Sequence, residues 1–496
     1  MSHEVVVVGG GIGGLTVAAL LAARGTDVCV LERQSQVGGC VTNFETFEYQ
    51  FEPTMGLYTC WGSGEAHQRI FSELPVEAPE ARAVDQPVTR LSDGSEVAFA
   101  SSNYVFEERL RQSFPECSEA AIEFYRQLSK IAEPLLQALR RVPDLPTASQ
   151  RQRMYAFAPR VDRVRQLRRL KKRILDEELK NTSQRFREFI ELQLRVFTAA
   201  RLDDSAYLPS CALLHSVQQG LFAIRGGAAN LAERLAESIQ QSGGKVRLNS
   251  SVLRLSYDPS GKATGVDLLS GENLIATKAI VSNMTVWDTY GKLIGLQRTP
   301  PEIKKVLGGL SSPGAYLIHA GIDEDAANSL RSNHFLIAND SAQATEELID
   351  PSRIGVAIAP EWDPRAPEGK RAATIMFSAD VSQWFTFHSD VEEQEAKDQA
   401  ALETGWAALH KRMPELGNAI EVIDTANPLT CYETTRRKLG MVGGIGLSPG
   451  LLEGQQLNHR TTLPNVFMVG DTVFPGAGIG AVSLGAFAVA NEIAPR

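Results

Sequence analysis

The chain has 496 residues, 43% of them hydrophobic, and a formal net charge of −9 at pH 7. This length exceeds one ordinary compact core and predicts two interleaved domains, while the acidic balance argues against nucleic acid as a general partner. The six cysteines are dispersed and show no metal-ligand spacing, so we expect reduced thiols in a cytoplasm, no disulfide framework and no metal site.

The first predicted elements are a strand, a helix and a second strand. Gly9, Gly11 and Gly14 form G-x-G-x-x-G directly after the apolar run VVVV, and Glu32 and Arg33 close the second apolar run. This is the layout of a dinucleotide-binding βαβ unit. In such a unit Gly9 permits a tight turn, Gly11 lets the backbone approach a pyrophosphate, and Gly14 lets helix and strand pack closely.

Two further features indicate what this unit binds. The helix is expected to begin near Gly13 and to direct its free N–H groups at phosphates, so the anion is held by backbone. Glu32 lies 18 residues beyond Gly14, where a carboxylate accepts hydrogen bonds from a ribose diol and repels a 2′-phosphate, which argues against NADP. Residues 5–23 are uncharged, but their glycine cluster favours this βαβ unit over a membrane span, and we expect no secretory leader before it.

A second pair of glycines, Gly38 and Gly39, follows the second strand. Glycines at this place allow another close approach of the backbone to a diphosphate and ribityl chain. An NAD-binding domain would continue instead into another βαβ repeat. The pattern is typical of FAD proteins of the glutathione-reductase type, so we predict FAD.

The C-terminal end repeats the order of strand, glycine-rich turn and helix. Gly470 and Asp471 follow an apolar strand, and Gly478 and Ile479 stand where the turn passes into the helix. An acid at a strand end before a helix N-terminus suits ribityl hydroxyls and the flavin pyrimidine edge. We therefore place these four residues in the cofactor site, although Asp471 could instead be an ordinary helix cap.

Between these ends the pattern changes several times. A hairpin is predicted over 85–100, and residues 104–200 have helical periodicity with charged faces. Short apolar runs alternate with turns over 300–425, which predicts an antiparallel sheet walling a cavity. Before that sheet we expect a helix over 230–241 and strands over 245–257 and 263–269.

The helical region carries a concentrated basic segment. Its apolar residues recur at helical spacing and the remaining positions are cationic, as in a helix that lies on an anionic bilayer. A solvated face of a core-packed helix explains the same pattern, because acids at 176–178 follow. No aromatic residues interleave with the charges, which argues against a nucleic-acid surface. The basic residues are Arg160, Arg163, Arg165, Arg168, Arg169, Lys171, Lys172 and Arg173.

Four motifs extend over nearly the whole chain: VVGGGIGGL with LER and VGG at the start, IRGGAANLAERLAE at 224–237, VSNMTVWDTYGKL at 281–293 and VGDTVFPGAGIGAV at 469–482. In these motifs the chain resembles the phytoene desaturase superfamily of flavoproteins. Within it the chain is most similar to the carotenoid cis-trans isomerases (prolycopene isomerases), with retinol saturases as near relatives. The first motif is shared by many FAD proteins, whereas the last two are more particular to the isomerase branch.

The resemblance implies an α/β fold in which a Rossmann-like FAD-binding domain of the glutathione-reductase type carries an inserted α+β substrate domain. It also implies a backbone contact to adenine at Val252, which on residue type alone could be a buried strand valine. The discontinuous FAD-binding domain would comprise 1–70, 220–295 and 455–496, and the substrate-binding domain 71–219 and 296–454, with a helical part near 150–190 that could face a membrane.

Two departures from the family pattern bear on the substrate rather than on the cofactor. Cys40 stands where the isomerase branch usually has serine and the saturase branch often has cysteine. The segment 427–450 keeps a Thr/Arg-rich core but lacks the usual basic continuation. Its Arg436 and Arg437 could be charges at a cavity edge or ordinary surface arginines.

The activity implied by the resemblance is cis-to-trans isomerisation of a long polyene, such as poly-cis lycopene, by reduced FAD without net redox change. Alternatives are a desaturase or saturase of a carotenoid, retinoid or related lipid, and a non-catalytic flavin-loaded polyene binder. The scaffold alone also leaves amine oxidation open. The sequence identifies no catalytic side chain, because histidines such as His215, His319 and His388 are scattered.

The expected partners follow from this chemistry. A hydrophobic small-molecule substrate would come from a bilayer, so we expect a cytoplasmic protein that can lie peripherally on the inner face of a membrane. No second complete G-x-G-x-x-G unit is present for NADPH, which indicates an external electron donor or acceptor. We expect no nucleic acid as a partner, and no sequence feature decides the oligomeric state.

Overall fold

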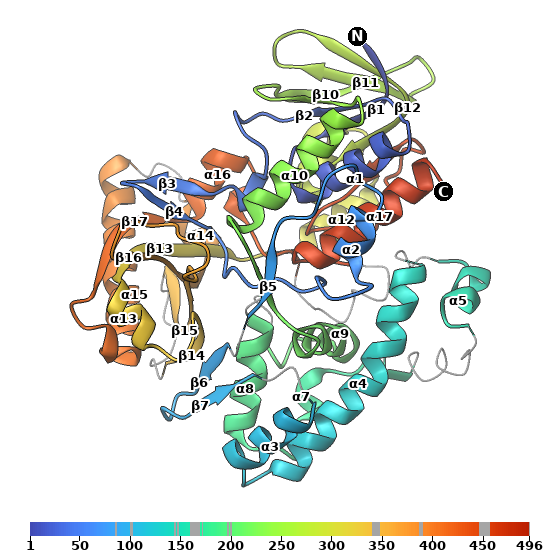
Figure 1. Ribbon diagram of the computed structural model, residues 1–496. Helices are drawn as coiled ribbons and strands as arrows, with labels where there is room; N and C mark the ends of the chain where they lie inside the picture. The colour runs from blue at the N-terminus through green and yellow to red at the C-terminus, as the bar shows by residue number, and fades with distance from the viewer. Residues whose placement is uncertain are drawn as a thin grey trace.

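The computed structural model has a mixed sheet with strands from the N-terminal, central and C-terminal parts of the chain, a second sheet and a helical layer (Figure 1). Among the helices that it describes, none is long and apolar enough to cross a membrane. The structure describes residues 1–84, 87–99, 103–142, 145, 148–158, 169–170, 172–195, 198, 201–339, 348–385, 390–445 and 457–495.

The first sheet joins segments that lie far apart in the chain. Its strands are β1 (Ser2–Val8), β2 (Val28–Leu31), β9 (Lys245–Arg247), β10 (Val252–Tyr257), β11 (Ala263–Leu268), β12 (Asn273–Ser282) and β18 (Val466–Met468). Their order is β10-β11-β12-β1-β2-β9, with β18 also against β12. Strands β18, β12, β1, β2 and β9 run parallel, whereas β10, β11 and the start of β12 form an antiparallel meander.

The valine run of β1 is buried because both faces of the sheet are covered. Val5 and Val7 pack into a core with helices of one face, and Val6 and Val8 pack into a separate core on the other face. Residues 5–23 thus form a strand and a helix. The first face carries α1 (Ile12–Ala23), α2 (Ala66–Phe71), α10 (Gly227–Gln241) and α17 (Ile479–Ile493); the second carries α11 (Val286–Asp288), the π-helical turn η2 (Thr289–Leu293) and α12 (Pro301–Gly309).

The single strand predicted over 245–257 is in fact two strands, β9 and β10. Asn249 between them has φ 53°. The N–H groups of Asn249 and Ser250 donate to the carbonyl oxygens of Gln34 over 2.9 Å and Glu32 over 2.7 Å. The chain therefore leaves the parallel edge beside β2 and turns around the end of that strand before it enters the meander.

The second sheet comprises β6 (Val88–Arg90), β7 (Glu96–Ala98), β13 (Gly314–Asp323), β14 (His334–Ala338), β15 (Ile349–Ile358), β16 (Lys370–Ala379) and β17 (Ile420–Ala426). Its order is β17-β13-β16-β15-β14-β6-β7, antiparallel throughout except between β14 and β6. This confirms the antiparallel sheet predicted over 300–425 and the hairpin over 85–100. Its core includes Tyr316, Phe377 and Trp384. The associated helices are α13 (Glu324–Ser329), α14 (Val381–Trp384), α15 (Val391–Arg412) and η3 (Pro414–Leu416).

A helical layer occupies the lower part of Figure 1 and confirms the helices predicted over 104–200. Phenylalanines dominate one part of its core: the rings of Phe114, Phe186 and Phe189 lie with centroids 5.2 to 6.2 Å apart in edge-on or tilted pairs. The layer contains α3 (Asn103–Ser113), α4 (Ser118–Arg141), α5 (Gln150–Ala156), α7 (Leu175–Glu178), α8 (Gln184–Arg195) and α9 (Tyr207–Gln218).

Most of the basic segment falls outside the described residues. Arg173 is described and pairs with Glu178 at 2.7 Å, an acidic partner of the kind that a solvated face would have. The membrane interpretation of the segment stays a prediction. Arg169, Lys172 and Arg173 are described, whereas Arg160, Arg163, Arg165, Arg168 and Lys171 are not.

Short elements connect the two sheets. Strand β4 packs on β16, and helix α16 packs on the 3-10 turn η1, so the segment after β2 reaches the second sheet and its C-terminal extension. The connecting elements are η1 (Gly39–Val41), β3 (Phe44–Thr46), β4 (Tyr49–Phe51), β5 (Ala81–Ala83), β8 (Phe222–Ile224), α16 (Pro428–Thr435) and η4 (Lys438–Gly440).

Candidate functional site

The first glycine turn lies where β1 passes into α1. Gly9 has φ +100°, a conformation that L side chains rarely adopt, and a Cβ on Gly14 would lie 2.3 Å from the Gly9 carbonyl oxygen. That distance is far inside van der Waals contact, so a side chain at position 14 would force helix and strand apart. The backbone therefore shows why the turn needs both glycines.

Asn283, directly after β12, fills the space beside this turn. A Cβ on Gly11 would lie 2.5 Å from its Nδ2 atom, and a Cβ on Gly13 would lie 2.6 Å from its Oδ1 atom. The Gly14 N–H donates to the same Oδ1 over 3.0 Å. The sequence analysis places Asn283 in a family motif but gives it no role. The available signal was an amide side chain at the carboxyl end of a parallel strand, the edge where ligands bind in such sheets.

Glu32 is buried at the end of β2, with 6% of its surface exposed. Its Oε2 accepts the Gly10 N–H and its Oε1 accepts the Gln34 N–H, each over 2.7 Å. Each carboxylate oxygen has a further lone pair, so both retain acceptor capacity for the hydroxyls of a ribose. The geometry of Glu32 therefore fits the predicted nucleotide.

The second glycine pair meets the first turn. The Gly38 N–H donates to the Gly10 carbonyl oxygen over 2.8 Å, and a Cβ on Gly39 would lie 3.5 Å from Gly11 Cα. Gly38 and Gly39 have φ values of 120° and 61°. Two glycine turns thus present bare backbone at one place, which fits a diphosphate held by main-chain groups.

Arg33 and Val252 lie at the margins of this arrangement. The Arg33 guanidinium donates to the carbonyl oxygens of Glu433 and Thr434, so it ties the end of α16 to the end of β2. Val252 begins β10 and is half-buried. The cofactor contacts predicted for these two residues stay predictions.

Asp471 follows β18 at the same edge of the first sheet, after Gly470 with φ 137°. Its carboxylate pairs with Arg437 at 2.7 Å. Burial alone would lower the pKa of Arg437, but Asp471 and two neighbouring thiols raise that pKa overall. Helix α17 begins only at Ile479, with Gly478 as its N-cap. The alternative in which Asp471 caps a helix is therefore wrong.

The two neighbouring arginines after α16 have different surroundings. The Arg437 side chain is 14% exposed and holds Asp471, so it is not an ordinary surface arginine. Arg436 is exposed, and its guanidinium lies 5.0 Å from the centre of the Tyr432 ring. The sequence left open whether these arginines lie at a site edge or at the surface. Arg437 lies at the edge of the candidate site, and Arg436 is a surface arginine.

Three predicted cofactor segments share one apolar cluster. Ile479 at the start of α17 packs in it with Val41, from the turn after Gly39, and with Ile224 and Ala228 around the start of α10. Tyr58 completes the buried part of the cluster. The structure thus brings the N-terminal, central and C-terminal segments together in one apolar cluster.

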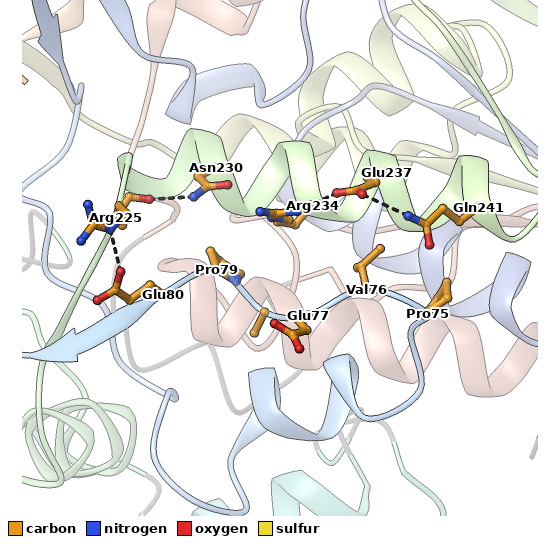
Figure 2. Close-up of a pocket in the computed structure, with 11 residues that line it drawn as sticks. Pro75, Val76, Glu77, Pro79, Glu80, Arg225, Asn230, Arg234, Glu237 and Gln241 are labelled. Atoms are coloured by element: carbon orange, nitrogen blue, oxygen red, sulfur yellow. Dashed lines mark hydrogen bonds and ion pairs between the residues drawn. The ribbon is translucent and has the colours of Figure 1, made fainter.

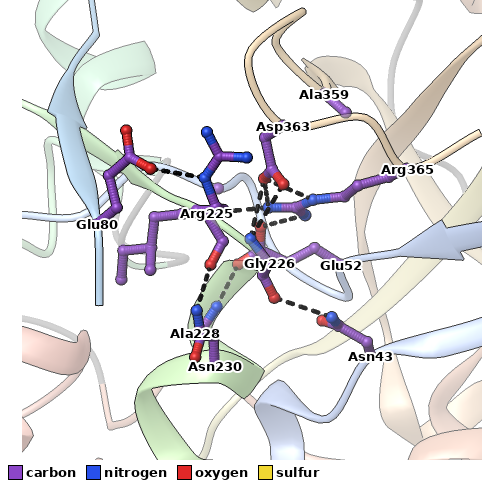
Figure 3. Close-up of polar contacts among 12 residues, drawn as sticks. Asn43, Glu52, Glu80, Arg225, Gly226, Ala228, Asn230, Ala359, Asp363 and Arg365 are labelled. Atoms are coloured by element: carbon purple, nitrogen blue, oxygen red, sulfur yellow. Dashed lines mark hydrogen bonds and ion pairs between the residues drawn. The ribbon is translucent and has the colours of Figure 1, made fainter. Parts of the chain in front are cut away.

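A buried polar network lies at the start of α10, where Figure 3 shows Glu52, Asp363 and Arg365 close together. Arg365 pairs with Glu52 at 3.1 Å, and its Nε donates to Asp363 over 2.8 Å. All three are buried: the exposed fraction is 7% for Glu52, 4% for Asp363 and 9% for Arg365. A buried carboxylate needs a cation or several donors, and one guanidinium here serves two acids.

The same carboxylates hold the first turn of α10. The Ala228 N–H donates to Glu52 over 3.1 Å, and the Gly226 N–H donates to Asp363 over 3.0 Å. The positive end of the helix adds to their stabilisation. No local sequence pattern predicts this network, because its members come from three distant segments.

An open cavity of about 610 Å³ lies between residues 75–80 and α10 (Figure 2). Arg225 and Glu80 pair across one end of it at 2.6 Å. Its walls carry both signs of charge and include none of the predicted cofactor residues. We therefore assign this cavity no part in the site.

Burial keeps two of the scattered histidines, His215 and His319, uncharged near neutral pH. Burial lowers the pKa of His319 to about 4, and its ring is stacked between those of Phe44 and Phe51. Burial also lowers the pKa of His215. His388 lies outside the described residues.

A comparison with known families decides the class of the protein. The family model described as "Flavin containing amine oxidoreductase" matches residues 12–493. The chain belongs to this family. A flavin cofactor and enzymatic activity of the oxidoreductase class follow from that membership.

Two relatives of this chain match it over almost its whole length, and their names specify an activity. Prolycopene isomerase 2 of an Oncidium hybrid cultivar is 26% identical, and the match covers 99% of this chain and 84% of the relative. All-trans-retinol 13,14-reductase of Homo sapiens is 25% identical, over 99% of this chain and 86% of the relative. These matches confirm the resemblance to carotenoid isomerases and retinol saturases.

Solved structures with low sequence identity confirm the fold. An oxidoreductase from Methanosarcina mazei superposes with a TM-score of 0.64 at 17% identity, over 99% of both chains. Putrescine oxidase bound to putrescine gives 0.63 at 16% identity, over 100% of both chains. The chain is thus an α/β protein with a Rossmann-like dinucleotide-binding domain and an additional domain.

Proposed function

We propose that the flavin is FAD. Glu32 would accept hydrogen bonds from its adenosine ribose, because both carboxylate oxygens keep a lone pair after binding Gly10 and Gln34. The first turn of α1 and the turn at Gly38 would hold the diphosphate through backbone N–H groups. Asp471 would accept from ribityl hydroxyls while its carboxylate stays paired with Arg437 at 2.7 Å.

We further propose that the enzyme isomerises cis double bonds of a long polyene, such as poly-cis lycopene, with the flavin in its reduced form. The observation that carries this proposal is the apolar cluster of Ile479, Val41, Tyr58, Ile224 and Ala228, which lies where the three cofactor segments meet. A polyene has almost no polar groups, so shape and apolar contact must recognise it. Prolycopene isomerases among the full-length relatives support the same substrate class.

The chain's own groups would position the polyene and exclude water. Reduced flavin supplies electron density that lowers the barrier to rotation about a conjugated double bond. Ile479 and Tyr58 would hold the chain of double bonds in place, since both belong to the apolar cluster. The positive end of α17, which begins after Gly478, favours negative charge beside it.

A second candidate is net redox chemistry: saturation or desaturation of a carotenoid, retinoid or related lipid. Two observations favour it. Cys40 stands where the saturase branch often has cysteine, and retinol 13,14-reductases are among the full-length relatives. Product mass separates the candidates, because isomerisation leaves the mass unchanged and net redox changes it by two hydrogens.

We propose that the substrate comes from a lipid bilayer and that a separate electron donor reduces the flavin. The side chains of Met154 and Tyr155 on α5 are 51% and 65% exposed, directly before the basic segment. Exposed apolar groups beside clustered cations suit the surface of an anionic bilayer, so we propose peripheral binding there. An external donor would reduce the flavin.

The first test is anaerobic incubation of the purified, FAD-loaded protein with poly-cis lycopene, with and without chemical reduction of the flavin. Chromatography and mass spectrometry of the product give the readout. We expect a trans product of unchanged mass only with reduced flavin. A mass change of two hydrogens would replace isomerisation by the second candidate.

A matched pair of variants tests the apolar cluster. Tyr58→Gln should abolish turnover with FAD still bound, because it places an amide in the cluster at a position outside the predicted cofactor residues, whereas Ile275→Gln on the exposed side of β12 should leave turnover intact. Equal turnover in both variants would contradict the assignment of the cluster. Bound FAD without turnover of any polyene would indicate a binder, and peroxide release with amines would indicate amine oxidation.

A further inference from the structure

Two cysteines from distant parts of the chain meet beside the second glycine turn. Cys40 lies in η1 and Cys431 in α16, and these two elements pack against each other. The two thiols lie within hydrogen-bonding reach. Both residues are half-buried free cysteines.

The groups around the pair make the two thiols unequal. The hydrogen bond from Cys40 and the charge of Arg437 lower the pKa of Cys431 to about 7 against the effect of burial. The hydrogen bond with Cys431 and then burial raise the pKa of Cys40. Asp471 and Thr435 are the other polar groups that face Cys431. Cys431 is therefore the thiol that reacts as a thiolate near neutral pH.

We propose that Cys40 and Cys431 form a redox-active dithiol that reacts with low-molecular-weight disulfides such as oxidised glutathione. The two thiols are in contact and lie on packed but separate elements, so a disulfide between them would link those elements. The resulting bridge would join the turn after Gly38 and Gly39 to α16. Helix α16 is already tied to the end of β2 through Arg33, so the bridge would close a second link at the same place.

The exchange proceeds in two balanced steps. The Cys431 thiolate attacks one sulfur of the glutathione disulfide, which forms a mixed disulfide and releases one glutathione thiolate. The Cys40 thiol then loses its proton and attacks the Cys431 sulfur, which closes the protein disulfide and releases the second glutathione. The protein dithiol has lost two electrons and two protons, and oxidised glutathione has become two glutathione thiols.

The test uses the full-length protein in buffers of graded reduced to oxidised glutathione. Remaining thiols are blocked with N-ethylmaleimide, and a protease that cuts after glutamate is then applied. Cys40 and Cys431 fall in the peptides 33–45 and 422–433, each with a single cysteine. We expect these peptides to appear cross-linked and two hydrogens lighter than their sum. Their absence, under conditions that modify other thiols, would overturn the proposal.

Single serine variants test the order of attack. In Cys40→Ser, Cys431 should be trapped as the mixed disulfide about tenfold faster than Cys40 is in Cys431→Ser. Cys117→Ser is the control, because Cys117 bonds Ser183 in the helical layer, and it should keep the 33–45 to 422–433 cross-link. Equal trapping rates, or loss of the cross-link in the control, would contradict the assignment. The readout concerns thiols alone, so it does not depend on the polyene assay.

Discussion

Glu32 and Glu52 are both buried glutamates that accept N–H groups of the backbone, but they differ in what balances their charge. Glu52 pairs with Arg365 at 3.1 Å and also holds the start of α10. The hydrogen bonds that the Glu32 carboxylate makes within the described residues go to backbone N–H groups of Gly10 and Gln34. Within the described residues, a cation balances the charge of Glu52, whereas Glu32 has backbone N–H donors.

The difference separates an acid that stabilises the fold from an acid for which we propose a ligand. A carboxylate with a cation and helix N–H groups has its acceptor capacity used within the protein, as at Glu52. A carboxylate held only by backbone N–H groups keeps acceptor sites for ligand hydroxyls, as at Glu32. Burial and residue type are alike at the two positions, so the partners decide the role.

The largest expected effect on stability comes from removing Arg365, the cation that pairs with Glu52, because Glu52 would then lack a cation as Glu32 does. Arg365→Met leaves Glu52 and Asp363 buried without their shared guanidinium. We expect the free energy of unfolding to fall by about 3–5 kcal/mol, because breaking a buried pair leaves an uncompensated charge. Urea unfolding of variant and wild type measures this loss.

The control for that variant is an arginine with a pair at the surface. Arg331 pairs with Glu96 at 3.4 Å, and its side chain is 81% exposed. Arg331→Met should change the free energy of unfolding by less than about 0.5 kcal/mol. If the two variants lose similar stability, the Glu52 network is not the structural element that we describe.

The next largest effect concerns the turn that faces Glu32. Gly14→Ala places a Cβ 2.3 Å from the Gly9 carbonyl oxygen, a rigid backbone atom. We expect a loss of about 3 kcal/mol in stability and weaker flavin binding, because α1 must move away from β1. Gly308→Ala in α12 meets no atom within 4 Å and should instead be neutral or stabilising by up to about 1 kcal/mol. Calorimetry and flavin absorbance measure both variants.

The contrast between the two glutamates also shows what the sequence could predict. Glu32 stands at a fixed spacing from Gly14 in a local motif, and the motif encodes its own geometry within a few dozen residues. The sheet strands around it were predictable for the same reason, from continuous apolar runs. Contacts that depend on one stretch of chain are visible in its sequence.

The network of Glu52, Asp363 and Arg365 was not predictable, because no local pattern links residues that lie hundreds of positions apart. Asn283 and Arg437 belong to the same class: each meets its partner only after the sheet has formed. The two strands found where one was predicted over 245–257 have a similar cause, since the break at Asn249 follows from a turn around the end of β2. Long-range geometry is the missing information in all these cases.

A smaller effect concerns His319, a buried titratable group that stacks on Phe51 and forms no ion pair with the residues that the structure describes. The pKa of His319 is about 4 in the fold, below the unfolded value of about 6.5. The unfolded chain therefore binds more protons between these values, and stability falls as pH decreases through that window. At pH 5 this costs about 2 kcal/mol relative to pH 8.

His319→Phe should remove this acid sensitivity, because a phenyl ring can keep the stacking on Phe44 and Phe51. Chemical unfolding of variant and wild type at pH 8 and pH 5 gives the measurement. His67 and His334 have similarly lowered pKa values but are present in both proteins, so their contribution cancels. An equal loss of stability in both proteins would show that His319 is not the responsible group.

The smallest effect sharpens the comparison itself. Glu32→Gln keeps the size of the side chain but replaces one acceptor oxygen by an NH₂ group and removes the charge. If Glu32 serves a ligand, FAD affinity should fall about tenfold, which corresponds to about 1.4 kcal/mol, with a smaller change in the stability of the protein without flavin. Glu45→Gln on the exposed strand β3 is the control and should leave both values unchanged. Fluorescence titration with FAD and unfolding of the flavin-free protein separate the two quantities. A loss of stability without a loss of affinity would place Glu32 in the same structural role as Glu52.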